Sequence, residues 1–316
     1  MLAFCLALSL LGDEPLRVEG PPFVVFGETV EFRAVTAVED AVVVWRLADG
    51  AAAVATKPAY DLRTLSVRGS GRIEMSSLGA SETDVRLSVS LERRGTRLAT
   101  VEHRVRIGPL LRVRAWCRVV ENEKGGTRRA GLVRDAKSRG ALQDDANRLL
   151  RPLGIEVSLE EGPAVKAPDA WFDAEGRFHP VELRNGEKAK TPSLSELFKR
   201  DAPAGLNVYF VRDCHWVTVQ EGFVRVVTDH ALVGIGMKDG QVVVDDASDA
   251  TVLAHELGHA FSLEDLKEKG ERGRLMYSLR KERRGVLLTW QEMKDARERA
   301  RLHLKSFHRA MAILGY

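Results

Sequence analysis

Residues 249–265 decide the fold of the C-terminal part of this chain, and they read DATVLAHELGHAFSLED. Ser248 or Asp249 is a good N-cap for a helix, and the apolar residues that follow recur at helical spacing. That pattern predicts a largely buried helix. Its apolar positions are Val252, Leu253, Leu257, Ala260 and Phe261.

The predicted helix carries two histidines and a glutamate in the spacing HExxH. His255 and His259 lie about one turn apart on the same face, so two imidazoles can reach one metal ion. Glu256 lies about 100° round the helix from His255, close enough to hold a metal-bound water without being a ligand itself. A buried helix bears these groups at low cost only when a cation partners them. The motif therefore predicts a metal site.

This segment resembles the metzincin metallopeptidases, in particular their matrixin and snapalysin-type members, whose motif continues as HExxHxxGxxH or HExxHxxGxxD. The resemblance implies that His255, His259 and Asp265 bind Zn²⁺ and that Glu256 is the general base. The second mark of the family is a methionine turn close to the metal, which Met276-Tyr277 matches. The implied reaction is hydrolysis of a peptide bond by a zinc-bound water that the glutamate activates.

Metzincins have glycine where this chain has Ser262. Glycine permits the sharp turn, with a positive φ, that brings the third ligand back to the metal. A serine in that conformation costs about 1–2 kcal/mol. The position of Asp265 therefore depends on Ser262, and Glu264 and Glu268 are the alternative third ligands.

Residues 109–316 are predicted to form an α+β metzincin-like catalytic domain, a twisted mixed sheet with the active-site helix and a C-terminal helix. Thr289 and Glu292 have capping-box spacing, which predicts the start of the C-terminal helix. Residues 161–205 contain five prolines and are expected to form a long surface excursion with one short helix near 193–199. Strands are expected at 110–120, 154–159, 206–211, 231–237 and 241–244, and the first helix at 141–150.

Residues 13–108 are predicted to form an all-β immunoglobulin-like sandwich. Apolar and polar residues alternate with a period of two, and no segment with a helical period intervenes. The most regular run has Val85, Leu87, Val89 and Leu91 on one face. Arg93-Arg94-Gly95 follows it as the turn of a hairpin. Trp45 resembles the buried tryptophan of immunoglobulin-like sandwiches, although their cysteine pair is missing.

Residues 1–12 are predicted to be a secretory signal peptide, with Ala7-Leu8-Ser9 as a small-x-small cleavage site. The alternative is an N-terminal strand or helix. The apolar run Met1–Leu11 is shorter than the about 20 residues that span a bilayer, so no transmembrane segment is expected. Export would place the protein outside the cell or in the cell envelope. There Cys117 and Cys214 can form a disulfide, with two buried thiols as the alternative.

Lys and Arg total 48 against 45 acidic residues, a net charge of +3. This balance argues against a nucleic acid as the main partner. The sequence thus predicts a secreted zinc-dependent endopeptidase with a protein or peptide substrate and a sandwich that binds a cell-surface or matrix ligand. Two alternatives remain. One is a catalytically inactive zinc-containing adhesion or carbohydrate-binding protein, in which Ser262 misplaces Asp265; the other is HExxH on an ordinary core helix without metal.

Overall fold

The computed structural model describes most of the chain, with gaps. The described residues are 15–47, 54–57, 65–68, 72–77, 81–122, 129–130, 136–172, 178, 181–185, 188–189, 205–211, 215–221, 226–231, 234–237, 239–245, 248–266, 274–276 and 288–313. The chain divides into two compact units. Unit 1 comprises Met1–Leu110, Arg151–Gly154 and Leu287–Lys294; unit 2 comprises Leu111–Leu150, Ile155–Val286 and Asp295–Tyr316.

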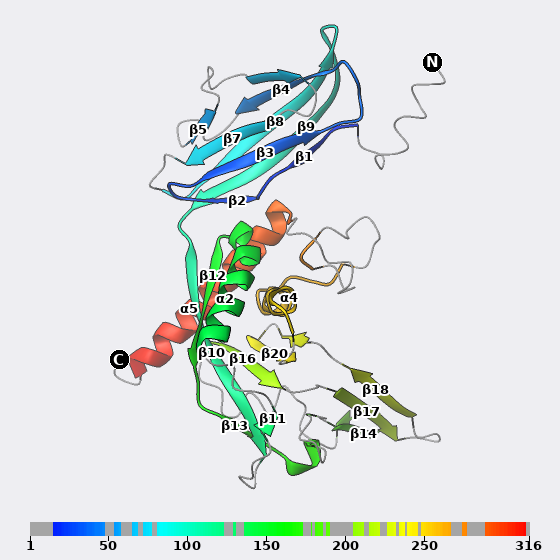
Figure 1. Cartoon of the computed structure of the whole chain (residues 1–316), viewed down its shortest axis with the longest axis vertical. Coiled ribbons are helices and arrows are strands. Elements are labelled where there is room, and N and C mark those ends of the chain that lie inside the picture. The colour runs from blue at the N-terminus through cyan, green and yellow to red at the C-terminus, as the bar shows by residue number, and fades with distance from the viewer. Residues whose placement is uncertain are drawn as a thin grey trace. The chain divides into compact units, whose positions relative to one another are not determined.

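Unit 1 contains two antiparallel sheets with one added parallel strand (Figure 1). One sheet has the order β1-β3-β7-β5 and the other the order β2-β9-β8-β4-β6. The strands are β1 (Arg17–Glu19), β2 (Phe23–Val25), β3 (Thr29–Val35), β4 (Val42–Leu47), β5 (Val54–Lys57), β6 (Leu65–Arg68), β7 (Arg72–Ser77), β8 (Thr83–Arg93) and β9 (Thr96–Gly108).

The two sheets of unit 1 share one hydrophobic core, which makes the unit a β-sandwich. Phe32 and Met75 from the first sheet pack in one cluster with Leu87 and Val105 from the second. Trp45 on β4 is buried in the same cluster, with 2% of its surface exposed. The strand order corresponds to A-B-E-D facing G-F-C, with β2 and β6 added at the edges, which is the immunoglobulin arrangement. The predicted immunoglobulin-like sandwich is confirmed.

The β8–β9 hairpin forms where the sequence predicts it. Arg94 and Gly95 both have positive φ, 50° and 77°, as a two-residue turn of type I′ requires. The alternating side of β8 is buried as expected. The hydrophobic pattern thus sets the register, because a slip by one residue would expose that whole row.

Unit 2 is built on a mixed sheet with the order β11-β10-β16-β20-β19, and β12 and β13 also pair with β10. The pairs of β10 with β12 and β16, and of β16 with β20, are parallel. The last strand of this order, β19, is antiparallel to β20. The strands are β10 (Leu111–Asn122), β11 (Arg129–Ala130), β12 (Ile155–Glu161), β13 (Val165–Ala167), β16 (Leu206–Val211), β19 (Gly234–Gly236) and β20 (Gln241–Asp245).

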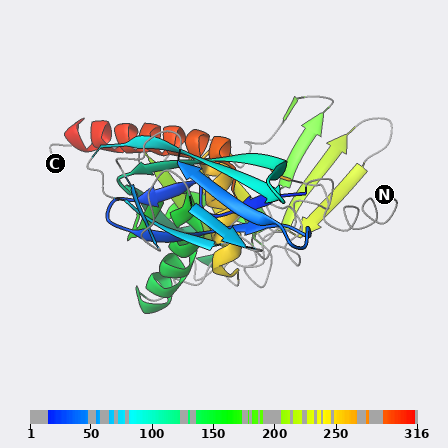
Figure 2. The same cartoon turned by 90° about the horizontal axis from the view of Figure 1, so that it is seen from above.

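A second, four-stranded sheet belongs to unit 2 and stands beside the first (Figures 1 and 2). Its order is β15-β14-β17-β18, formed by β14 (Val181–Asn185), β15 (Lys188–Ala189), β17 (His215–Glu221) and β18 (Val226–Ala231). The described helices of unit 2 are α2 (Ala136–Leu150), α4 (Ala250–Ala260) and the part of α5 (Trp290–Ile313) that follows Lys294, and the short turn η3 (Asp169–Trp171) comes after β13. The short turn η2 (Arg151–Leu153) directly follows α2 in the chain and is assigned to unit 1. Figure 2 shows α5 as one continuous helix.

The predicted surface excursion at 161–205 is wrong for the residues that the structure describes there. This segment supplies β13, β14 and β15, and Trp171 and Phe178 are buried in a core that Tyr209 also joins. Of its prolines, Pro163 and Pro168 lie in the described residues, on either side of β13. Because β14 pairs with β17, about thirty residues further along, no local pattern reveals it. The expected helix near 193–199 lies outside the described residues.

The sheet positions α4 next to its last two strands. β20 is almost entirely buried, and the chain leaves it to enter α4, which contacts β19, β20 and α2. In the described part of the chain no helix combines the length and the apolar composition needed to cross a membrane.

Candidate metal centre

The helix α4 begins and is buried as the sequence predicts. Asp249 is its N-cap, and its carboxylate accepts hydrogen bonds from the amides of Thr251 and Val252 at 3.0 and 3.1 Å. These bonds satisfy two of the donors that a helix start leaves open. His255 and Glu256 are only 3% and 5% exposed, so the helix carries polar groups into the interior.

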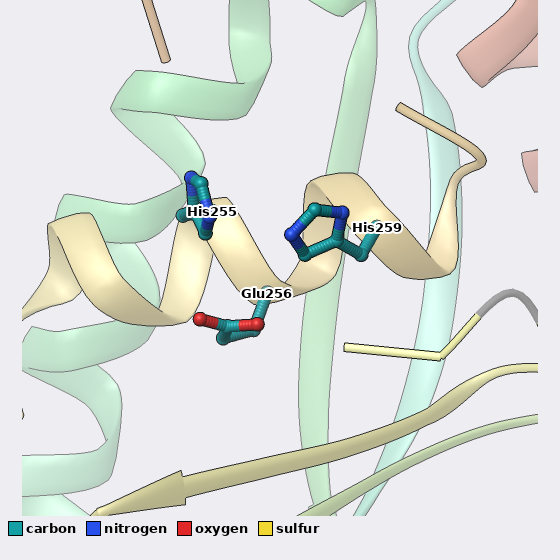
Figure 3. Close-up of side chains that lie close together, drawn as sticks. All are labelled: His255, Glu256 and His259. Carbon is teal, nitrogen blue, oxygen red and sulfur yellow. The ribbon is translucent and has the colours of Figure 1, made fainter. Parts of the chain in front are cut away.

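The two histidines present the same ring nitrogen to one point. His255 Nδ1 donates to the carbonyl of Leu275 at 3.1 Å, and His259 Nδ1 donates to the carbonyl of Leu263 at 2.9 Å. A carbonyl oxygen can only accept, so each Nδ1 carries a hydrogen, and in the neutral form of each ring Nε2 has a lone pair. Figure 3 shows both imidazoles on one side of α4 and Glu256 on the adjoining side.

Two carboxylates, those of Asp265 and Glu256, lie near the imidazoles of His255 and His259. Asp265 Oδ1 is 3.2 Å from His255 Nε2 and 3.6 Å from His259 Nε2. Four ligands around Zn²⁺ at about 2.0–2.1 Å in a tetrahedron are about 3.3–3.4 Å apart. The polar atoms of His255, Glu256 and His259 lie within 4.8 Å of one another. The Asp265 oxygen, on a side chain that is 41% exposed, lies at distances that a third ligand would have, and the cluster that could hold an ion consists of His255, Glu256 and His259.

Ser262 makes the turn that brings Asp265 to the histidines. Its φ is 69°, in the left-handed region. The amide of Ser262 donates to the carbonyl of His259 and that of Leu263 to the carbonyl of Gly258, both at 2.9 Å. These two bonds are those of a Schellman motif, in which this position is usually glycine. Of the alternative ligands, Glu264 is exposed and Glu268 lies outside the described residues.

The strained serine yields a stability prediction. Ser262→Gly is expected to raise the free energy of unfolding by about 1 kcal/mol, because glycine avoids a cost of about 1–2 kcal/mol but has more freedom to lose on folding. Urea unfolding measures the change. As a control, Ser138→Gly in α2 should lower the stability by about 0.5–1 kcal/mol. A stability equal to or below that of the unsubstituted chain for Ser262→Gly would contradict the prediction.

Met276 lies against α4, and its role as a methionine turn remains a prediction. It is fully buried, and a Cβ built on Gly258 would lie 2.5 Å from its Sδ. Its carbonyl accepts from the amide of Leu266 at 2.9 Å. Residues 274–276 thus hold both the His255 ring, through Leu275, and the segment that carries Asp265. Tyr277 lies outside the described residues.

The predicted disulfide remains a prediction. Cys117 is buried on β10, and Cys214 lies outside the described residues, as does the predicted signal peptide.

One histidine that sequence reasoning set aside supports the end of α4. His303 on α5 is buried, and its Nε2 donates to the carbonyl of Ala260 at 3.0 Å. Burial lowers the pKa of His303, an effect that the bond to Ala260 opposes, so the ring is neutral at pH 7. His303 matches no metal-ligand spacing, and only the fold brings it to the last turn of the site helix.

Two glycines on β19 also went unnoticed in the sequence. Gly234 and Gly236 lie two residues apart, hence on the same side of the strand, and that side contacts Glu256 and His259. The signal was present as Gly-x-Gly within an apolar run, since glycine in a strand marks close approach by another backbone.

Comparison with known proteins adds little. No protein-family model and no curated protein matches the chain. Among solved structures, the C. elegans MSP family member WR4 is 10% identical with a TM-score of 0.22, over 30% of this chain and 96% of that one. The YadV chaperone is 12% identical with a TM-score of 0.23, over 30% and 52%. A CARDB domain from Pyrococcus furiosus is 12% identical with a TM-score of 0.19, over 30% and 91%. Scores this low carry no argument about function.

Proposed function

We propose that unit 2 is a zinc-dependent endopeptidase of metzincin type. The observation that carries this proposal is the convergence of three lone-pair donors, His255 Nε2, His259 Nε2 and Asp265 Oδ1, at 3.2 and 3.6 Å. Two imidazoles and a carboxylate that meet at one point favour a cation between them, with the side chains of His255, His259 and Asp265 exposed by 4%, 20% and 41%. Three protein ligands leave the fourth position of a tetrahedral zinc ion for water, as in catalytic sites.

The chemistry divides between the metal and Glu256. Bound zinc supplies a Lewis acid for the substrate carbonyl and lowers the pKa of a bound water toward neutrality. Glu256 follows His255 in the helix, and one of its ligand atoms lies within 4.8 Å of those of both histidines. Its carboxylate takes the proton of the attacking water and passes it to the leaving amine. The carbonyls of Leu275 and Leu263 hold the two imidazoles in the required tautomer.

The surroundings of the site favour a peptide substrate. β19 ends the strand order of the main sheet in the described part of the chain, and it runs directly beside Glu256 and His259. An extended peptide can add to such a strand through main-chain hydrogen bonds.

The C-terminal helix α5 that the metzincin resemblance implies starts with its capping box. The amide of Glu292 donates to Thr289 Oγ1 at 3.2 Å, and the amide of Thr289 donates to Glu292 Oε2 at 2.6 Å.

Removal of the metal tests the proposal. The purified protein is expected to contain about one zinc per chain, to cleave casein or gelatin, and to lose cleavage when 1,10-phenanthroline removes the zinc. Adding Zn²⁺ back should restore cleavage, whereas the non-chelating 1,7-isomer should leave it unchanged. Protein without metal, or cleavage that survives complete zinc removal, would overturn the proposal.

The inactive zinc-containing adhesion or carbohydrate-binding protein remains the competing function. It depended on Ser262 holding Asp265 away from the histidines, and the 3.2 Å separation from His255 favours the enzyme instead. Stoichiometric zinc without turnover of any peptide in a library would decide for it. For the whole chain we propose secretion through the leader predicted at 1–12, with the sandwich binding a cell-surface or matrix ligand.

A further inference from the structure

The strand β19 passes unusually close to the site helix. An ideal Cβ built on Gly234 would lie 2.5 Å from Glu256 Cγ and 2.8 Å from both Cδ and Oε1 of the same side chain. Non-bonded carbon atoms pack at about 3.5–4.0 Å. The volume that a side chain at position 234 needs is therefore the volume that the Glu256 carboxylate and its stem occupy.

The second glycine of β19 limits a different part of the helix. A Cβ on Gly236 would lie 2.1 Å from the carbonyl oxygen of Glu256 and 2.7 Å from His259 Cβ. These atoms belong to the helix backbone and to the root of a metal-ligand side chain, and neither can swing aside. Gly236 therefore limits the distance between strand and helix, whereas the three atoms nearest to a Cβ on Gly234 all belong to the Glu256 side chain.

We propose that Gly234 is a positioning residue for Glu256, a role that rests on the proposed function. Having no side chain, it leaves open the space beside β19 that the Glu256 side chain occupies, from which the carboxylate would act on a water if the site held zinc. Any larger residue would rotate the Glu256 side chain out of that place without moving His255 or His259. Misplacing a catalytic group by about 1 Å can cost 10²-fold in rate, so the effect should appear in catalysis rather than in metal binding.

Kinetics of Gly234→Ala test this role. We expect kcat on a casein-derived peptide to fall by about 10²-fold or more, as for loss of a general base, with KM within about 2-fold because the substrate still pairs with the backbone of β19. Zinc content should stay at the wild-type value. The visible absorption spectrum of the Co²⁺-loaded protein, which reports the ligand geometry, should be unchanged.

A double substitution separates positioning from general damage. If Gly234 acts only through Glu256, Gly234→Ala in the Glu256→Gln background should cause no further loss of kcat. Additive losses would overturn the proposal. So would wild-type kcat in Gly234→Ala, or loss of its zinc.

Alanine substitutions at two other glycines serve as comparisons for the kinetic and spectroscopic measurements. Gly236→Ala should disturb the helix itself and so change the Co²⁺ spectrum and weaken zinc binding. Gly140→Ala on α2 has no atom within 4 Å of the added Cβ and should leave kcat, KM and zinc content unchanged. If Gly236→Ala and Gly234→Ala behave alike in the Co²⁺ spectrum, the distinction drawn between them is wrong.

A crystal structure of the Gly234→Ala variant tests the positioning role of Gly234 independently of any peptidase activity. Should the wild-type chain cleave no peptide, the proposed function fails, yet the structure still decides the packing role. A displaced Glu256 carboxylate with both imidazoles in place supports the inference. A carboxylate in its original place overturns it.

Discussion

Glu256→Gln is expected to abolish peptide hydrolysis while leaving the zinc in place. Glutamine has nearly the same shape as glutamate but cannot accept the proton of the attacking water, so kcat should fall by about 10²–10⁴-fold. Because the proposed ligand set of His255, His259 and Asp265 does not include Glu256, zinc content should remain about one per chain. Hydrolysis of a quenched peptide, together with metal analysis of the same preparation, measures both quantities.

The conservative variant sharpens this test. Glu256→Asp keeps the charge and shortens the side chain by one methylene, so it should retain part of the activity if the carboxylate acts as base. Two outcomes contradict the role assigned to Glu256. One is equal cleavage by Glu256→Gln and the wild type, and the other is loss of zinc from Glu256→Gln, which would make Glu256 a ligand.

Asp265→Ala is expected to weaken zinc binding by more than about 100-fold and to remove activity with it. Groups that merely support metal ligands already cost about 10–100-fold when they are replaced, and Asp265, at 3.2 and 3.6 Å from the two imidazoles, is the proposed third ligand. Competition for zinc with a chromophoric chelator measures the affinity. Its neighbour Glu264 is exposed, so Glu264→Ala is the matched control and should bind zinc as the wild type does.

The same distances also fit an ion pair between Asp265 and a protonated His255. In that case no metal is needed, and Asp265→Ala would change zinc affinity by less than about 3-fold, far below the about 10–100-fold that even a supporting group contributes. The affinity measurement thus distinguishes a ligand from a simple ion-pair partner. If the site binds zinc, His255→Ala and His259→Ala should lose it whether Asp265 is a ligand or an ion-pair partner.

Local patterns predicted much of what surrounds the site. The burial of α4, its N-cap Asp249 and the Thr289–Glu292 capping box all depend on residues within a few positions of each other. The β8–β9 hairpin and its buried row followed from the alternation of side chains and a turn with positive φ. Such features are predictable because one element, or one pair of neighbouring strands, contains all the interacting atoms.

Non-local pairing escaped prediction. The segment at 161–205 was expected to be a surface loop, yet it supplies β14, whose parallel partner β17 lies beyond β16 in the chain. His303 comes from α5 to the carbonyl of Ala260. In both cases, the sequence of one partner contains no periodic pattern that identifies the other partner.

By itself, the sequence determined that two imidazoles and a carboxylate share one buried helix, because a spacing of four residues is nearly one helical turn. Only the tertiary structure showed that the Asp265 carboxylate lies next to both imidazoles. Ser262 adopts a left-handed conformation that its residue type disfavours, with Gly258 and His259 accepting the two hydrogen bonds of its turn. The contact between Gly234 and Glu256 was likewise visible only in the tertiary structure. A contact between a strand and a helix depends on how they pack and not on either sequence alone.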